Sequence, residues 1–391
     1  MSTNLANLYN RYRPTTFNNV VGQASIVTVL RNATTRNRIA GSYLFRGPRG
    51  SGKTSTARIL CKAANCIEWS STGDVCDECT GCLKALEDAI ELDAATNRGI
   101  PAIEELLESL QYRPKFVDKR FVIIDEAHQL TSGALNALLK IVEEPPNYIH
   151  FVFCTTDMSL IDPDSSVRLT EDKKAFATLS SRCQTFEFSS VAPDSVLQKL
   201  KYICEKEGCQ VSEDLLISLV GRSGGSLRDA ENLLDMVLVL YENNPPDDVL
   251  RLLYGDIEFL SAEFLKECCL GSVTDGLLFA SKLWDSGCSV QDVASRCLEF
   301  ISDVIKLNAG LTVYRPSAIV RVLQEISDKV EHNRLNSVIM AFTELYNSNR
   351  GTILSLELVV CDSMTNIVEP DSTSDDIVEE SEVSNIHLQP W

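Results

Sequence analysis

The chain has 391 residues, more than the ~100–200 residues of one typical domain, so we expect two or three domains. Hydrophobic residues make up 44% and charged residues 23%, which excludes a wholly disordered or low-complexity polymer. The net charge of −19 is unevenly spread, because residues 1–60 hold nine Arg or Lys and no acid, whereas residues 367–391 hold seven acids and no base. The basic block would accept an anion such as phosphate, although a solvated basic face would have the same composition.

No apolar run approaches the ~18 residues of a membrane span, and the N-terminus lacks the apolar segment of a secretory signal. We therefore expect a cytoplasmic protein without a membrane partner. Of the fourteen cysteines, ten are scattered in apolar or helical contexts and are expected to be small buried residues. The other four are grouped.

In chain order, the first 188 residues alternate helical and apolar strand patterns. This alternation predicts an α/β domain whose parallel sheet is covered by helices on both faces. The expected strands are 42–45, 121–125 and 150–156, and the expected helices are 25–40, 55–65, 103–114 and 132–142.

From Val191 onward the strand pattern ends and helical periodicity takes over. Three helices are expected at 192–208, 212–224 and 226–243, and after the boundary marked by Pro245 and Pro246 five more at 261–271, 275–287, 290–310, 317–333 and 334–349. The acidic segment 367–391 is poor in aromatic residues and is expected to be disordered.

Residues 47–54 fit the phosphate-loop pattern G-x-x-x-x-G-K-[ST], between an expected strand and an expected helix. Glycines let backbone N–H groups surround a phosphate, and the helix N-terminus adds positive potential. We expect Lys53 to reach the β- and γ-phosphates of ATP and the Thr54 hydroxyl to ligate Mg²⁺. The loop residues expected to bind the nucleotide are Gly47, Pro48, Arg49, Gly50, Ser51, Gly52, Lys53, Thr54 and Ser55.

The apolar strand 121–125 ends in Asp125, and Glu126 follows it. A phosphate loop needs such a strand to hold its metal ion, so we expect the Asp125 carboxylate to bind Mg²⁺ through water. Glu126 would then lie on the γ-phosphate side and polarise a water molecule. This pair of acids favours hydrolysis over nucleotide binding alone.

Four cysteines, Cys66, Cys76, Cys79 and Cys82, lie close together in the sequence. Tetrahedral zinc requires such closely spaced thiolates, and a site with four cysteine ligands is structural because no open position remains. A disulfide pair with spare thiols and an iron–sulfur cluster are the alternatives. Composition favours zinc.

With these motifs the chain resembles the bacterial DnaX family, the gamma/tau ATPase subunits of the DNA polymerase III clamp loader. The resemblance covers about residues 8–366 and includes YNRYRPTTFNNVVGQ, the phosphate loop, the four cysteines, FVIIDEAHQL, CTTD, SRC and GSLRDAENLLD. It implies an AAA+ P-loop base domain over 1–188 with the cysteine module at 66–82. A small helical lid over 189–244 and an all-helical collar over 245–366, which assembles five subunits in a ring, would follow.

The resemblance also implies roles for individual residues. A segment enclosing adenine would contain Arg11, Tyr12, Pro14, Val21 and Gly22, although an N-terminal arm packed on the sheet is the alternative. Thr155 and Thr156 would align the attacking water, and Arg228 of the lid would contact the phosphates unless it pairs with Asp229 or Glu231. Arg182 would reach the γ-phosphate bound by a neighbouring subunit, in trans. The implied catalytic residues are Lys53, Asp125, Glu126, Thr156 and Arg182.

The implied function is that of a motor that uses ATP to load a sliding clamp onto primed DNA during replication. The implied partners are delta-type and delta-prime-type subunits, the clamp and primed template DNA, and the implied location is at the nucleoid. Arg98 is our candidate contact to DNA phosphates. We find no polymerase active site, although such subunits are grouped with the polymerase holoenzyme.

Two points are left open by the sequence. An ATP-binding scaffold with little turnover is an alternative to the motor, and a kinase-like transferase is disfavoured by Arg182 and Arg228. The insertion 158–180 either adapts the chain to a neighbour or loops outward. The chain resembles the short gamma form, because the long extension of the tau form is missing.

Overall fold

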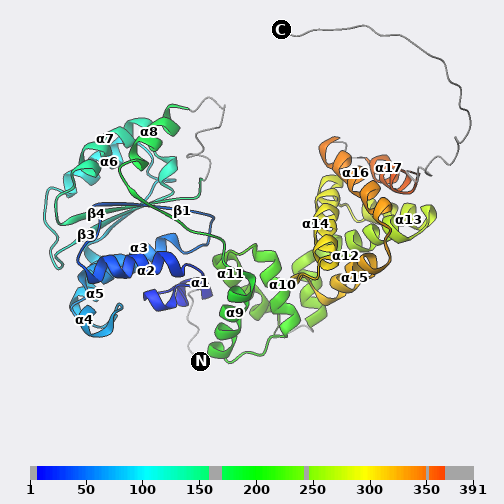
Figure 1. The fold of residues 1–391 in the computed structure, drawn as a ribbon, viewed down its shortest axis with the longest axis horizontal. Coiled ribbons are helices and arrows are strands. Elements are labelled where there is room, and N and C mark those ends of the chain that lie inside the picture. The colour runs from blue at the N-terminus through cyan, green and yellow to red at the C-terminus, as the bar shows by residue number, and fades with distance from the viewer. Residues whose placement is uncertain (1–6, 158–169, 242–245, 349–351, 366–391) are drawn as a thin grey trace, which may run out of the picture. The chain divides into compact units, whose positions relative to one another are not determined.

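The structure is a computed structural model, and it describes residues 7–157, 170–241, 246–348 and 352–365. These residues fold into two compact units (Figure 1). The first is drawn from Met1–Gly255 and Thr312–Val320, and the second from Asp256–Leu311 and Arg321–Trp391. The segment 158–169 and the predicted disordered tail lie outside the described residues.

A five-stranded parallel sheet forms the centre of the first unit, with strand order β2-β3-β4-β1-β5. The strands are β1 (Ser42–Arg46), β2 (Ile90–Asp93), β3 (Arg120–Asp125), β4 (Ile149–Thr155) and β5 (Gln184–Glu187). The predicted α/β domain with a parallel sheet is confirmed, and the phosphate loop follows β1. The predicted strands are confirmed, whereas β2 and β5 were not predicted because they are short edge strands without a run of buried side chains.

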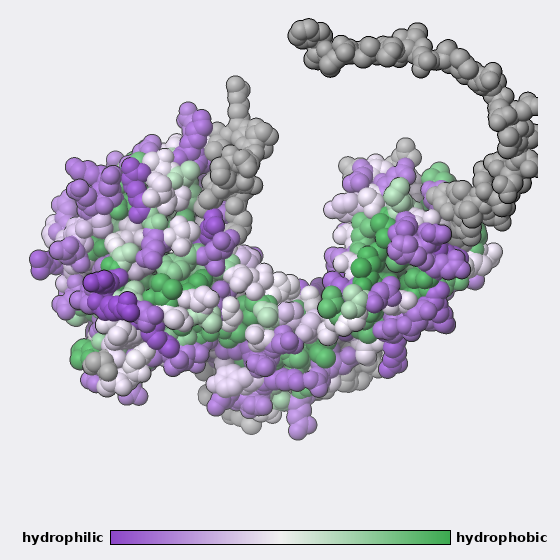
Figure 2. Space-filling model, in the orientation of Figure 1, coloured by the Kyte–Doolittle hydropathy of each residue, from purple (hydrophilic) through white to green (hydrophobic). Residues whose placement is uncertain are grey.

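Helices cover both faces of this sheet, as predicted (Figure 1). On one face lie α2 (Ala24–Thr35), α3 (Lys53–Asn65) and α5 (Thr80–Asp88), and on the other lie α6 (Ile100–Ser109), α7 (Ser132–Glu143) and α8 (Glu171–Ser180). Successive residues of β3 point to opposite faces of the sheet. Phe121 and Ile123 pack in the core on the α3 side, whereas Val122 and Ile124 pack in the core on the α7 side. Hydrophilic side chains cover much of the outward surface over α6 and α7 (Figure 2).

One prediction in this unit needs correction, and one question that the sequence left open is narrowed. The helix predicted over 25–40 ends at Thr35, because Asn37 takes a left-handed backbone conformation with φ of 50°. The part of the insertion that the structure describes does not loop outward: α8 packs with α7, and its Phe176 and Leu179 are buried. The alternation of apolar and polar residues in α8 has the spacing of a helix with one buried face.

Three helices complete the first unit, as predicted: α9 (Pro193–Glu207), α10 (Glu213–Ser223) and α11 (Leu227–Tyr241). Left-handed glycines end α9 and α10, at Gly208 and Gly224. The segment Thr312–Val320 returns to this unit from far along the chain. Ser317 donates to both carboxylate oxygens of Asp214 at 3.0 Å, which ties the segment to α10.

The second unit is entirely helical in its described residues. It is built from α12 (Pro246–Leu270), α13 (Val273–Asp285), α14 (Val290–Asn308), α15 (Ser317–Lys329), α16 (His332–Ser348) and α17 (Ile353–Thr365), although α12 and α15 begin in the first unit. Large apolar side chains such as Phe264, Phe300 and Phe342 fill its core. The five predicted helices are confirmed and α17 is an addition. Within the described ranges, no helix has both the length and the apolar character that a bilayer crossing requires.

Asp88 at the end of α5 generates the first testable prediction. Its buried carboxylate accepts hydrogen bonds from the backbone N–H groups of Lys115, Phe116 and Val117, at 3.2, 2.6 and 3.1 Å. We expect Asp88→Ala to lower the free energy of unfolding by about 2–4 kcal/mol, because three backbone donors lose a charged acceptor. Equilibrium urea unfolding of the full chain measures this change.

The neighbouring substitution Glu87→Ala is the matched control. Glu87 is exposed and pairs with Lys84 on the same helix turn, so its loss is expected to change stability by about 0.5 kcal/mol or less. Equal effects of the two substitutions would show that the Asp88 carboxylate does not hold this loop.

Candidate nucleotide site

A pocket of about 810 Å³, including its open mouth, lies beyond the carboxyl ends of β1 and β3, between the sheet and the helices α9 and α11. Thirteen predicted site residues line it: Pro14, Val21, Arg49, Gly50, Ser51, Gly52, Lys53, Thr54, Ser55, Asp125, Glu126, Thr156 and Arg228.

The phosphate loop takes a conformation that only glycine permits at two positions. Gly47 has φ of 148°, and a Cβ there would lie 2.2 Å from the Phe188 carbonyl oxygen. Gly50 has φ of 74°, and a Cβ there would lie 2.0 Å from the Ser226 hydroxyl oxygen. The loop therefore lies in close contact with the turn that precedes α11.

Lys53 is buried at the N-terminus of α3, and its ammonium group points back into the loop. It donates hydrogen bonds to the carbonyl oxygens of Gly47 at 2.9 Å and Pro48 at 2.8 Å. Burial lowers the pKa of Lys53, and the nearby acids partly offset this. A phosphate at the helix N-terminus would meet both this charge and the free N–H groups of the first turn.

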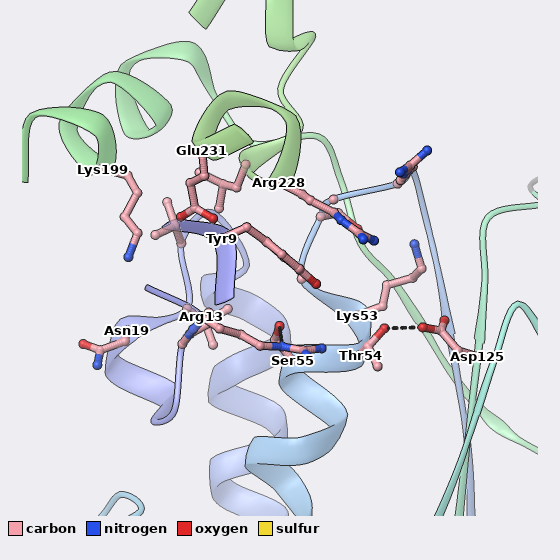
Figure 3. Close-up of a pocket in the computed structure, with 18 of the residues that line it drawn as sticks. Tyr9, Arg13, Asn19, Lys53, Thr54, Ser55, Asp125, Lys199, Arg228 and Glu231 are labelled. Atoms are coloured by element: carbon pink, nitrogen blue, oxygen red, sulfur yellow. Dashed lines mark hydrogen bonds between the residues drawn. The ribbon is translucent and has the colours of Figure 1, made fainter. Parts of the chain in front are cut away.

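The two predicted magnesium ligands lie in direct contact. The Thr54 hydroxyl donates to Asp125 Oδ2 at 2.9 Å (Figure 3). A hydroxyl and a carboxylate at this separation offer the oxygen ligands that Mg²⁺ prefers, so the residues present fit the ion.

Glu126 follows Asp125 in a left-handed conformation, with φ of 48°. Its Oε2 accepts a hydrogen bond from the Thr156 hydroxyl at 2.9 Å and lies 3.4 Å from His128 Nδ1. His128 Nδ1 in turn lies 3.0 Å from the Thr155 hydroxyl. The residues at the end of β4 thus hold the Glu126 carboxylate in place. The motif CTTD alone did not predict this contact.

The opposite wall of the pocket comes from the N-terminal segment and from α11. Arg228 reaches from α11 toward the phosphate loop, and its guanidinium lies 4.6 Å from the centre of the Tyr9 ring (Figure 3). Arg13 donates to the Ser55 hydroxyl at 3.0 Å. Positive charge therefore faces the loop from two other segments of the chain.

Polar groups also lie at the other end of the pocket. Lys199 of α9, Glu231 of α11 and Asn19 lie there, away from Lys53 and Asp125 (Figure 3). Glu231 is buried, and this burial raises its pKa to about 8, although the Lys199 charge lowers it. We did not predict Tyr9, Arg13, Asn19, Lys199, Leu227 or Glu231 as pocket residues.

Other predicted nucleotide-binding residues do not line the pocket. Arg11 and Tyr12 contact Glu207 at the end of α9, with 2.7 Å between the Arg11 and Glu207 side chains. Gly22, Gly47, Pro48 and Thr155 are close in sequence to lining residues but do not line it themselves.

Arg182 and Arg98 both lie outside this pocket and are exposed. Arg182 donates to the Thr178 carbonyl oxygen at 2.8 Å and to Glu143 Oε2 at 3.2 Å. Arg98 lies two residues before α6, and its carbonyl oxygen accepts from the N–H of Thr131, the N-cap of α7, at 3.0 Å. Their roles in a neighbouring site and at DNA stay predictions.

The four grouped cysteines form a second candidate site. All four Sγ atoms lie within 4.8 Å of one another, with 3.7 Å from Cys66 to Cys76 and 3.8 Å from Cys76 to Cys82. Zn–S bonds of about 2.3 Å in a tetrahedron place sulfur atoms about 3.8 Å apart. The N–H groups of Ile67 and Cys82 donate to Cys79 Sγ at 3.4 Å. Burial raises the pKa of Cys79, but these bonds outweigh it and leave the pKa at about 6. The cluster therefore fits zinc.

The chain is similar in sequence to known proteins. The family model described as "DNA polymerase III, delta subunit" matches residues 22–192. The DNA polymerase III subunit gamma/tau of Mycoplasma pneumoniae is 39% identical over 234 residues, which cover 59% of this chain and 32% of that protein. The subunit tau of Bacillus subtilis is 37% identical over 353 residues, which cover 88% of this chain and 60% of that protein.

This chain is a homologue of the gamma/tau subunits of bacterial DNA polymerase III. The resemblance inferred from the motifs is confirmed. The chain spans about a third of the Mycoplasma relative and less than two thirds of the Bacillus relative. Among solved structures, a mutant of RuvB from Thermotoga maritima aligns with a TM-score of 0.45 at 17% identity, covering 65% of this chain and 79% of RuvB.

The buried Glu231 carboxyl leads to a prediction about pH. Because its pKa is higher in the folded chain than its ordinary value of 4.5, folding favours the protonated form, and stability falls as pH rises from about 4.5 to about 8. We expect Glu231→Gln to match the wild type at pH 4.5 and to be more stable at pH 8, on the order of 3 kcal/mol. Thermal unfolding at several pH values measures this difference.

The exposed Glu213 at the start of α10 provides the control substitution, Glu213→Gln. Its effect on stability should not grow with pH over this range. A constant difference between Glu231→Gln and the wild type from pH 4.5 to 8 would contradict a raised pKa of Glu231.

Proposed function

We propose that this chain is the ATPase motor subunit of a DNA polymerase III clamp loader. It would couple ATP binding and hydrolysis to the loading of a sliding clamp onto primed DNA. The observation that carries the proposal is the convergence of Lys53, Thr54, Asp125, Glu126 and Arg228 on one pocket, in a homologue of the gamma/tau subunits.

Different residues of the pocket would bind different parts of ATP. The N-terminus of α3 and Lys53 would hold the β- and γ-phosphates, with Arg228 adding charge from the lid. Thr54 and Asp125 would hold Mg²⁺, which when bound neutralises charge on the phosphate oxygens. The apolar segment of Pro14, Val20 and Val21 would contact the adenine.

Glu126 would act as the group that orients and polarises the attacking water. Its Oε2 accepts a hydrogen bond from the Thr156 hydroxyl at 2.9 Å. A γ-phosphate oxygen beside Thr156 would compete for that hydroxyl, and the released carboxylate would then accept a hydrogen bond from water. This contact between the residues that follow β3 and β4 would make the base sensitive to the substrate.

Arg182 would complete the site of a neighbouring subunit. Its side chain is 31% exposed and that of its acidic partner Glu143 is 60% exposed, so another subunit could displace this weak pair. An arginine supplied in trans adds positive charge to the γ-phosphate only in the assembled ring. The proposed partners are delta-type and delta-prime-type subunits in a five-membered ring, the clamp and primed DNA, with Arg98 as a phosphate contact.

Arg182→Ala tests this arrangement. In the ring reconstituted with the partner subunits, we expect the ATPase rate to fall at least about 100-fold, while ATP binding by the isolated chain is unchanged. Steady-state phosphate release and calorimetric ATP binding measure the two quantities.

Arg38→Ala is the control, because Arg38 is an exposed arginine that does not line the pocket. Its ATPase rate should equal that of the wild type. Unchanged turnover in the Arg182→Ala ring would rule out the proposed role of Arg182, and a loss of ATP binding would place it in its own chain's pocket.

We also propose that the four cysteines hold one structural zinc ion. Purified wild-type chain should then contain about one zinc ion per chain by elemental analysis, and Cys79→Ser should contain little or none. Cys209→Ser is the control, because Cys209 is outside the cluster and donates to the Cys204 carbonyl oxygen. Full zinc content in Cys79→Ser, or none in the wild type, would contradict this site.

A further inference from the structure

We propose that the cysteine segment 66–82 positions the base end of the nucleotide pocket through Asp74, so that zinc binding and nucleotide binding strengthen each other. The inference rests on the proposed function, because it takes ATP as the ligand of the pocket and zinc as the ligand of the cysteines. It makes Asp74 a positioning residue, which touches neither ligand.

Asp74 lies two residues before Cys76, and its carboxylate collects four hydrogen bonds. Its Oδ1 accepts from the N–H groups of Phe17 at 3.0 Å and Val75 at 2.8 Å. Its Oδ2 accepts from the N–H of Asn18 at 2.9 Å and from Arg31 Nη2 at 3.2 Å. The residue is only 5% exposed. One buried carboxylate therefore fixes a piece of backbone that is distant in the sequence.

The backbone that Asp74 holds continues directly into the pocket wall. Phe17 and Asn18 begin the short helix η1 (Phe17–Asn19), and Asn19, Val20 and Val21 line the pocket. Figure 3 shows Asn19 at the end of the pocket opposite Lys53. A shift of the Asp74 carboxylate would therefore move the wall that the base would contact.

Apolar packing joins the same two segments. Trp69, in the short helix α4 (Trp69–Thr72), packs edge-on against Phe17 with 6.2 Å between ring centres. Phe17 is 1% exposed, and Val75 belongs to the same buried cluster. The cysteine segment thus supports η1 through an aromatic contact as well as through a charged acceptor.

The metal would in turn hold this support in place. The segment between Cys66 and Cys82 contains only the four-residue helix α4 before α5 begins at Thr80, and few of its side chains are buried. A loop of this kind depends on its metal ligands for a defined shape. Cys66 also directly follows α3, whose N-terminus lies at the phosphate end of the pocket. Zinc would therefore stabilise both ends of the nucleotide site.

Coupling of this kind is reciprocal, because each ligand must change the affinity for the other by the same factor. We expect Mg²⁺ and ATPγS, a slowly hydrolysed ATP analogue, to raise the zinc affinity about fivefold or more, so that less zinc is released to the chelator 4-(2-pyridylazo)resorcinol at equilibrium. Removal of zinc should weaken ATPγS binding, measured by calorimetry. Both measurements use the wild-type chain, so they test the coupling between zinc and nucleotide binding even if a variant misfolds.

Two isosteric substitutions separate positioning from general stability. Asp74→Asn replaces Oδ2 with an amide that cannot accept from the N–H of Asn18 or from Arg31, so its zinc release should no longer respond to ATPγS. Asp77→Asn is the control. Asp77 is nearer to Cys79 in the sequence and pairs with Lys62, and the structure shows no contact from it to Phe17 or Asn18. Its zinc release should respond as in the wild type.

The inference is overturned if wild-type zinc release is the same with and without bound ATPγS, or if Asp74→Asn responds as the wild type does. Equal loss of the response in both variants would also overturn it, because the effect would not depend on the contact with η1. Failure of the proposed function would appear differently, as a wild-type chain that binds no ATPγS or carries no zinc.

Discussion

The hydrogen bond between Thr54 and Asp125 joins the two parts of the chain on which the nucleotide site depends. Thr54 lies in the first turn of α3, the helix after β1, and Asp125 ends β3. Their meeting requires a parallel sheet, because only parallel strands bring their carboxyl ends to one edge. The strand order also places β4 between them, so its final threonines lie beside Glu126. The order and direction of the strands therefore determine which groups meet in the site.

The second wall of the site is built from segments that lie far from the sheet in the sequence. Gly50 accepts the close approach of Ser226, and this contact sets the start of α11 and hence the place of Arg228. The Tyr9 ring lies beside Arg228, with its centre 4.6 Å from the guanidinium. Any movement of α9 and α11 against the sheet would change how many positive groups face the phosphate loop. Such a movement is a physical means of coupling nucleotide state to shape.

Much of the site could be predicted because its signals are local. The phosphate loop is one continuous motif, and Asp125 and Glu126 end a run of apolar residues that can only be a buried strand or helix segment. Lys199 and Glu231 could not be predicted, because α9 and α11 bring them to the pocket only through tertiary packing. Asp74 was missed for the same reason, since its partners lie 57 and 56 residues earlier in the chain. The edge strands β2 and β5 were not predicted, because half-exposed strands of four residues show little hydrophobic pattern.

The proposed function depends on whether this pocket turns over ATP in response to the proposed partners. The most direct measurement is the steady-state ATPase rate of the wild-type chain assembled with delta-type and delta-prime-type subunits, with and without sliding clamp and primed DNA. A motor predicts that clamp and primed DNA together raise the rate severalfold and that neither does so without the partner subunits. An assembled complex that binds ATP but hydrolyses it at the same slow rate under all conditions would contradict the motor function and indicate a scaffold.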